Sequence, residues 1–165
     1  MAIEINLEGK TVAVTGGGRG IGRAIAILLA EAGADVWIGN RKEEQSQGTV
    51  KEIQALGRKS GYTVMDVVDS DGMDKFLDDA EKLGNGKLDI MINAAGVIDT
   101  DSFLNMSDAQ FRKLLDINTV GVNNALQGAI KKMIPHKAGK IVVISSFAGR
   151  KGLGLLAQYL SLIHI

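Results

Sequence analysis

The chain has 165 residues, and its 19 lysine plus arginine residues balance 19 aspartate plus glutamate residues, giving a formal net charge of zero. This length favours one domain, the even charge argues against nucleic-acid binding, and the lack of cysteine excludes disulfides and cysteine-ligated metals. We expect no metal, no membrane partner and a cytoplasmic location, because no apolar run could span a bilayer and residues 1–10 lack a signal-peptide pattern.

Short apolar runs and helical patterns alternate from one end of the chain to the other. The runs, each expected to form a strand, are residues 11–15, 35–39, 62–65, 88–92 and 140–144. Helices are expected over 21–32, 43–56, 71–83 (with Ser70 as N-cap) and 107–134. The alternation predicts an α/β protein with a doubly wound parallel sheet of the Rossmann type, in which ligands bind beyond the carboxyl ends of the strands.

A glycine-rich turn joins the first expected strand to the first expected helix, and it reads Thr15-Gly16-Gly17-Gly18-Arg19-Gly20-Ile21-Gly22. Glycine lets a backbone approach a pyrophosphate closely and adopt positive φ, and the N-terminus of the following helix attracts phosphate. Such a turn alone could be only a tight connection. Between the first strand and first helix of a βαβ series, it favours nucleotide binding.

The T-G-x-x-x-G-x-G spacing of this turn resembles that of the short-chain dehydrogenase/reductase family, and differs from the T-G-x-x-G-x-x-G of the family's extended branch. Further family motifs follow in order, namely Asp66 after the third strand, Asn93-Ala94-Ala95-Gly96 after the fourth, Asn118 in the long helix, Ser145-Ser146 after the fifth strand, and Tyr159. The resemblance covers residues 7–159 and implies a single dinucleotide-binding Rossmann domain with strand order 3-2-1-4-5.

The resemblance also implies a nicotinamide-dinucleotide site, in which Asp66 holds the adenine amine. NAD-preferring members place an acid after the second strand, but this chain has Asn40 there, followed by Arg41, and Arg19 adds a second guanidinium. Arginine suits a 2′-phosphate because its planar fork donates paired hydrogen bonds, so we expect NADP(H) rather than NAD(H). The alternative is that both arginines are solvated surface charges. The full set of expected cofactor-binding residues is Gly16, Gly18, Arg19, Gly20, Ile21, Gly22, Asn40, Arg41, Asp66, Val67, Asn93, Ala94, Ala95 and Gly96.

The catalytic roles implied by the resemblance fall on Asn118, Ser146 and Tyr159. The tyrosine donates a proton to the substrate carbonyl oxygen, the serine fixes that oxygen, and the asparagine supports a water-linked proton relay. Ser146 is preferred to Ser145 because it stands thirteen residues before Tyr159, as in the family. The implied enzyme is a homo-oligomer that transfers a hydride between NADP(H) and a small carbonyl or secondary alcohol. A sugar or polyol, a small ketone and a 3-oxoacyl substrate all stay open.

The family's lysine, four residues after the tyrosine, is replaced by Ile163. The hexapeptide at 160–165 is also what the mosaic end of a transposase sequencing adapter encodes, so we expect this tail to be non-native. On that hypothesis residues 7–159 are an incomplete domain that lacks its later strands, and the chain itself is inactive although its parent is an oxidoreductase. The alternative is a non-catalytic nucleotide-binding or redox-sensing module on the same fold.

Overall fold

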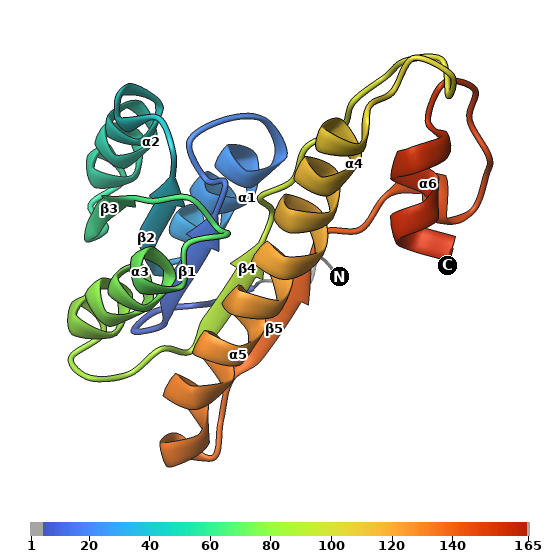
Figure 1. Ribbon diagram of the computed structural model, residues 1–165. Coiled ribbons are helices and arrows are strands. Elements are labelled where there is room, and N and C mark those ends of the chain that lie inside the picture. The colour runs from blue at the N-terminus through green and yellow to red at the C-terminus, as the bar shows by residue number, and fades with distance from the viewer. Residues whose placement is uncertain (1–4, 165) are drawn as a thin grey trace.

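The computed structural model describes residues 5–164, and its centre is a five-stranded parallel sheet of order β3-β2-β1-β4-β5 (Figure 1). The predicted doubly wound parallel sheet and its strand order are therefore confirmed. Each strand overlaps its predicted run, and the first matches it residue for residue. The strands are β1 (Thr11–Thr15), β2 (Asp35–Asn40), β3 (Ser60–Val64), β4 (Ile90–Asn93) and β5 (Lys140–Val143).

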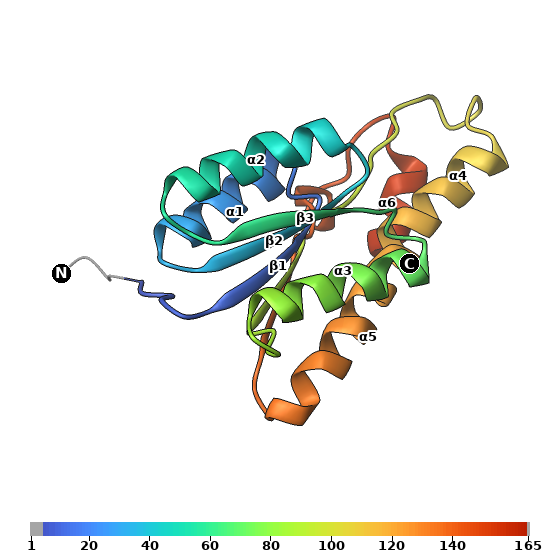
Figure 2. The same ribbon diagram turned by 90° about the vertical axis from the view of Figure 1, so that its left-hand side faces the viewer.

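Helices cover both faces of this sheet. Figure 2 shows α1 and α2 on one face and α3 and α5 on the other, whereas α6 stands away from the sheet beside α4. The α-helices are α1 (Gly20–Glu31), α2 (Glu43–Ala55), α3 (Ser70–Leu83), α4 (Asp108–Leu115), α5 (Gly121–Met133) and α6 (Ala157–His164). Shorter helical turns are η1 (Asp116–Val120), η2 (Ile134–His136) and η3 (Phe147–Gly149).

The central strand β1 is buried along its whole length and divides the core in two. Val12 and Val14 point into the cluster under α1 and α2, while Ala13 points into the cluster under α3 and α5. Successive side chains of a strand point to opposite faces, so a run without polar alternation is what a strand covered on both faces requires.

Helix α1 packs on the sheet through its small residues. Gly22, Ala26 and Ala30 are buried, whereas the apolar side chains of Ile21 and Leu28 are 66% and 62% exposed. Nearly every residue of this helix is apolar, so helical spacing does not identify the buried side. Small residues let the helix lie close to the strands, and that closeness selects the buried face.

Two helix predictions are corrected by the structure. Asp69, and not Ser70, caps α3, because the Asp69 carboxylate accepts a hydrogen bond from the Asp71 N–H at 3.1 Å while Ser70 is already helical. The long helix over 107–134 begins at Ser107 as predicted, with a capping box to Gln110, but it is interrupted by η1, a π-helical turn. Such turns widen a helix locally and are frequent at functional sites.

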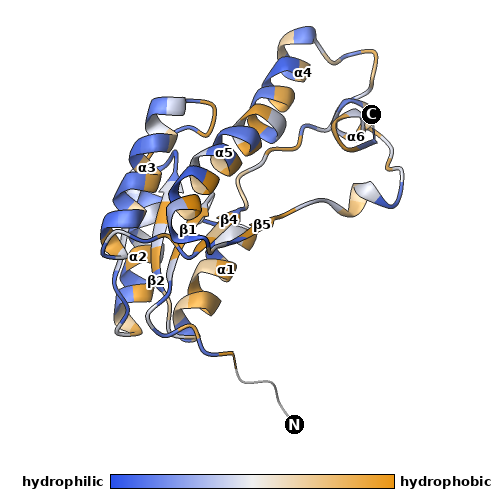
Figure 3. Cartoon of the chain, turned by 90° about the horizontal axis from the view of Figure 1, so that it is seen from below, coloured by the Kyte–Doolittle hydropathy of each residue, from blue (hydrophilic) through white to orange (hydrophobic). Residues whose placement is uncertain are grey.

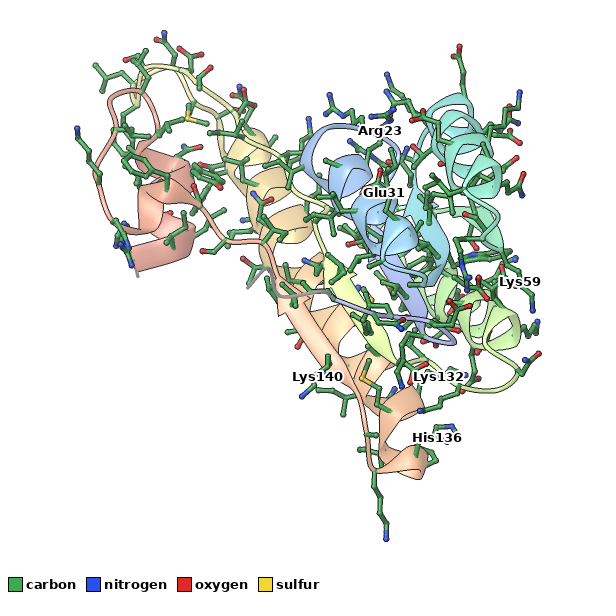
Figure 4. All side chains as sticks on the ribbon, turned by 180° about the vertical axis from the view of Figure 1, so that it is seen from behind. Arg23, Glu31, Lys59, Lys132, His136 and Lys140 are labelled. Carbon is green, nitrogen blue, oxygen red and sulfur yellow. The ribbon has the colours of Figure 1, made fainter. Side chains whose placement is uncertain are left out.

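The strands begin at the end of the molecule remote from the glycine turn. Seen from below, β5 lies at an edge of the sheet (Figure 3). Figure 4 places Arg23 at the glycine-turn end and Lys140 and His136 at the opposite end, where His136 is exposed. Lys132 lies near this second end and joins α5 to α3 through ion pairs of 2.6 Å with Asp78 and 2.8 Å with Glu81. No helix within residues 5–164 is long and apolar enough to cross a membrane.

Candidate functional site

The carboxyl ends of β1, β2, β3 and β4 surround a pocket of about 350 Å³. Twelve of the fourteen residues predicted to bind the cofactor line it, and Gly18 and Asn93 do not. The lining residues are Gly16, Arg19, Gly20, Ile21, Gly22, Gly39, Asn40, Arg41, Met65, Asp66, Val67, Ala94, Ala95, Gly96, Val97 and Ile117. The topology therefore gathers four loops, far apart in sequence, around one concave space.

Glycine is required in the β1–α1 turn by backbone shape and by close approach. Gly16 and Gly20 have φ of +69° and +55°, in the left-handed region that glycine adopts without strain. A Cβ atom on Gly16 would lie 2.9 Å from both the N and the Cα of Ala95, so a side chain there would push two loops apart. No side chain caps α1 at Arg19, and Gly20, Ile21 and Gly22 at its first turn line the pocket. This is the cradle that a pyrophosphate fits.

The two predicted cofactor residues outside this pocket have other neighbours. A Cβ atom on Gly18 would lie 3.0 Å from Asn40 Cγ and 3.1 Å from Gln45 Cβ, so Gly18 makes room for α2 and the end of β2. Asn93 is 2% exposed, and its Oδ1 accepts a hydrogen bond from Thr15 Oγ1 at 2.8 Å. The same Thr15 hydroxyl accepts a hydrogen bond from the Ala95 N–H at 3.3 Å, which joins the ends of β1 and β4.

Arg41 and Asp66, predicted to bind the 2′-phosphate and the adenine amine, form an ion pair with each other at the outer rim of the pocket. Arg41 Nη1 lies 3.7 Å from Asp66 Oδ2, and the two side chains are 55% and 38% exposed. The Asn40 amide, at the end of β2, donates to Lys42 O at 3.1 Å. Arg19 is also exposed and forms no ion pair within the part of the chain that the structure describes. The guanidinium and amide groups at this rim can bind a phosphate, and Asn40 carries an amide at the position where an acid is expected in NAD-preferring members.

A second pocket, of about 610 Å³, adjoins the first and contains the three predicted catalytic residues. The two pockets share Ile21 and the segment Ala94–Val97. The polar residues that line the second pocket are Asn93, Asn118, Ser145, Ser146 and Tyr159. Residues 118, 146 and 159 come from a helix, a strand end and a separate helix, so their meeting at one pocket depends on the fold.

The side chain of Asn118 clamps the loop after β4. Its Nδ2 donates to Val97 O at 2.8 Å, and its Oδ1 accepts from the Val97 N–H at 2.9 Å. Asn118 lies within the π-helical turn η1. Both ends of the amide are therefore engaged by the Val97 backbone, and the side chain fixes a wall that belongs to both pockets.

The serine pair and the tyrosine lie on the far side of the second pocket. Ser145 is exposed, while Ser146 caps η3 by accepting a hydrogen bond from the Ala148 N–H at 3.1 Å. Tyr159 is half-buried on α6, and Ile163, one turn later, lines the same pocket. The apolar side chain of Ile163 thus lies four residues after Tyr159, at the position where the motif described in the sequence analysis has a lysine.

The prediction from sequence missed several residues of the site. Val97, Ile117 and Val122 line the pockets, and Asn124 holds the loop after β3, which lines the first pocket, through hydrogen bonds to Val67 O and Val68 O. A polar pair inside a helix, Asn123-Asn124, was the available signal, because asparagine disfavours helix interiors unless its side chain has a partner. Within residues 5–164, no three histidine, aspartate or glutamate side chains gather as a metal site.

Comparison with known proteins agrees with this geometry. The family model described as short chain dehydrogenase matches residues 10–161. The chain is similar to the 3-oxoacyl-(acyl-carrier-protein) reductase FabG of Aquifex aeolicus, with 36% identity over 151 residues that cover 91% of this chain and 60% of that protein. The chain therefore spans about three-fifths of the length of such relatives.

Solved structures of related proteins share the fold. A short chain dehydrogenase from Burkholderia cenocepacia in complex with NADP has a TM-score of 0.84 and 32% identity, covering 94% of this chain and 63% of that one. Carveol dehydrogenase from Mycobacterium avium in complex with NAD has a TM-score of 0.90 and 26% identity, covering 96% of this chain and 62% of that one.

Proposed function

The chain belongs to the short-chain dehydrogenase family, and from this premise we propose that its parent enzyme transfers a hydride between NADP(H) and a carbonyl compound or secondary alcohol. The observation that carries the proposal is the shared wall of the two pockets. The glycine turn lines one pocket, Asn118, Ser146 and Tyr159 line the other, and Ala94–Val97 belongs to both. The bound dinucleotide would supply the hydride, and the protein would supply its position and the proton.

The residues of the first pocket would hold the cofactor by complementary chemistry. The first turn of α1 would bind the pyrophosphate, Asp66 and Val67 the adenine, and Arg41 with Arg19 the 2′-phosphate. Related structures contain NAD in one case and NADP in another, so the preference has to come from this chain's own rim. Asn40 in place of an acid, with two arginines beside it, supports NADP(H).

The second pocket would carry the proton chemistry. Tyr159 would donate a proton to the carbonyl oxygen, Ser146 would hydrogen-bond the same oxygen, and Asn118 would hold the loop that separates the pockets. A phenol titrates near pH ~10 and needs a nearby cation to work near neutrality. Because Ile163 supplies none, we propose negligible turnover for the 165-residue chain itself.

The substrate class stays at a small carbonyl compound or secondary alcohol. One relative is named as a 3-oxoacyl reductase and another as a carveol dehydrogenase, so members of this family are named for different substrates. Family membership therefore does not decide among a 3-oxoacyl group, a ketone and a polyol. We also propose that the parent enzyme is a cytoplasmic homo-oligomer, in keeping with the expectation from sequence.

The proposal is tested by titrating the 165-residue chain with adenosine 2′,5′-bisphosphate and with AMP, followed by amide chemical shifts in NMR. We expect the bisphosphate to bind at least about tenfold more tightly, since one added charge-assisted contact is worth roughly 1.5 kcal/mol or more. We also expect no measurable NADPH oxidation with carbonyl substrates. Equal affinity for the two ligands would remove the NADP(H) preference, and no binding of either would remove the proposed function.

A nucleotide-binding module without chemistry is the second candidate, and the observation that favours it is Ile163. The two candidates are separated by reading the gene from independent source DNA past the codon for Tyr159. A lysine four residues after Tyr159, in a continuing reading frame, supports the reductase and our proposal that residues 160–165 are non-native. The codons for Leu160 to Ile165 followed by a stop in that DNA would support the module instead.

A further inference from the structure

The first turns of α5 contact the loop that forms the adenine end of the first pocket. Asn124 Nδ2 donates to Val67 O at 3.1 Å and lies 3.4 Å from Val68 O. Gly121, one turn earlier, is buried against the same residue, and a Cβ atom there would lie 2.9 Å from Val67 Cβ. Val67 is 7% exposed and lines the pocket beside Asp66. The loop after β3 is thus held by a hydrogen bond and by close packing.

The same helical stretch holds the opposite wall of the pocket. Asn118, six residues before Asn124, clamps the Val97 backbone through both halves of its amide. Val97 and Val67 both line the first pocket, from the loops after β4 and β3. One continuous element therefore sets the spacing between the two walls, with one asparagine on each.

Asn123, the residue before Asn124, makes no such contact with the β3–α3 loop within residues 5–164. Asn123 is exposed, and its only side-chain hydrogen bond within residues 5–164 is accepted from Gln127 Nε2 at 3.4 Å on the same helix. Asparagine is a poor helix former, so two in a row in α5 lower its intrinsic stability. Asn124 differs from Asn123 because its side chain donates a hydrogen bond to the backbone of the β3–α3 loop.

We propose that Asn124 is a positioning residue for the adenine end of the cofactor site, an inference that rests on the proposed function. It holds the β3–α3 loop so that Asp66 and Val67 stand at a fixed distance from the glycine turn. Without this hydrogen bond the loop carbonyls of Val67 and Val68 turn to solvent, and the loop samples positions that no longer match an adenine ring. Ligand binding then has to select the matching position from a wider set.

The test compares Asn124→Ala and Asn124→Leu with Asn123→Ala in the full 165-residue chain. The leucine variant keeps the approximate shape of the side chain and removes the N–H donor without adding a charge, so it stays informative even where the alanine variant folds poorly. Adenosine 2′,5′-bisphosphate is titrated against each protein, and the amide shifts of residues 66–68 are followed. We expect both Asn124 variants to bind about fivefold more weakly than wild type, the effect of one lost hydrogen bond, and Asn123→Ala to bind as wild type does.

The outcomes separate the inference from the proposed function. A lower thermal midpoint for the Asn124 variants, with unchanged affinity and unchanged shifts at residues 66–68, would overturn the positioning role and leave the function standing. No binding by the wild-type chain would overturn the proposed function and the inference together. Weakened binding confined to the Asn124 variants supports both.

Discussion

At the scale of single residues, the ion pair between Arg41 and Asp66 bears on the NADP(H) preference that we propose. Both side chains are well exposed, and the atoms are 3.7 Å apart, so their attraction is worth at most about 1 kcal/mol. A 2′-phosphate carries more charge than one carboxylate and can take two parallel hydrogen bonds from the guanidinium. The pair can therefore open at small cost, which would leave Asp66 free for the adenine contact that we propose.

Replacing Arg41 by alanine tests this assignment. We expect Arg41→Ala to weaken the binding of adenosine 2′,5′-bisphosphate by about tenfold and to leave AMP within about twofold, because only the 2′-phosphate loses a charged partner. Calorimetric or NMR titration measures both. Arg112→Ala, an exposed arginine on α4, is the matched control. An equal loss for the two ligands would show that Arg41 supports the fold of the rim and does not read the phosphate.

At the scale of elements, Asp89 ties the beginnings of three strands together. Its Oδ2 accepts from the Thr11 N–H at 3.1 Å, its own N–H donates to Thr11 O, and its carbonyl accepts from the Lys140 N–H at 2.9 Å. Burial raises the pKa of this carboxyl, but hydrogen bonds from Lys87 and Thr11 and the charges of Lys87 and Lys10 outweigh it, so the pKa lies below its ordinary value. The ionised form is the one that the fold prefers.

This preference predicts a pH-dependent stability. A carboxyl whose pKa is lower in the folded state stabilises the fold above its unfolded pKa of about 4, and the contribution is lost as the pH falls through the folded pKa. We expect Asp89→Asn to reduce the free energy of unfolding by about 1–2 kcal/mol at pH 7, and by progressively less as the pH falls below about 4. Urea unfolding at several pH values measures it.

The control for this prediction is Asp74→Asn. Asp74 is exposed on α3 and has no ion pair among residues 5–164, so its replacement should change the stability little at any pH. A cost of Asp89→Asn that does not vary with pH would mean that shape, and not charge, is what the site requires.

At the scale of the whole molecule, the centre of the sheet and its β5 edge differ in how far they are buried. β1 is buried and paired on both sides, whereas among residues 5–164 β5 pairs with β4 alone, and Val142, Val143 and Ile144 are 45%, 43% and 36% exposed. Helix α6 stands off from the sheet beyond this edge (Figure 1). An edge strand with few buried contacts opens locally at lower free energy than a central strand.

Hydrogen exchange measures this difference directly. The Ile144 amide bonds to Asn93 O at 2.9 Å and the Val14 amide lies in the paired centre of the sheet, so both are protected in the folded chain. We expect the Ile144 amide to exchange at least about tenfold faster than that of Val14 once intrinsic rates are removed. Equal protection would mean that the sheet opens only as one cooperative unit.

The sequence by itself determined the parts of this protein that depend on neighbouring residues. Unbroken apolar runs predicted β1 and the parallel sheet, and the spacing of Gly16, Gly20 and Gly22 predicted the glycine turn, because close approach at Gly16 and Gly22 and positive φ at Gly16 and Gly20 favour glycine. The buried face of α1 could not be predicted from the sequence, because nearly all of its residues are apolar. The interruption of the long helix at η1 could not be predicted from the sequence either, because a π-helical turn depends on the packing around it.

Only the tertiary structure decided which side chains hold the site together. The partners of Asn118 and Asn124 are backbone groups 21 and 57 positions away, and Arg41 meets Asp66 across two neighbouring strands. Such contacts have no periodicity in the chain, because they arise when parallel strands bring their carboxyl ends to one edge. Local sequence patterns therefore predict the helices, the strands and the glycine turn. The spacing of the pocket walls is a property of the folded sheet and of the helical stretch η1–α5, which contacts both walls.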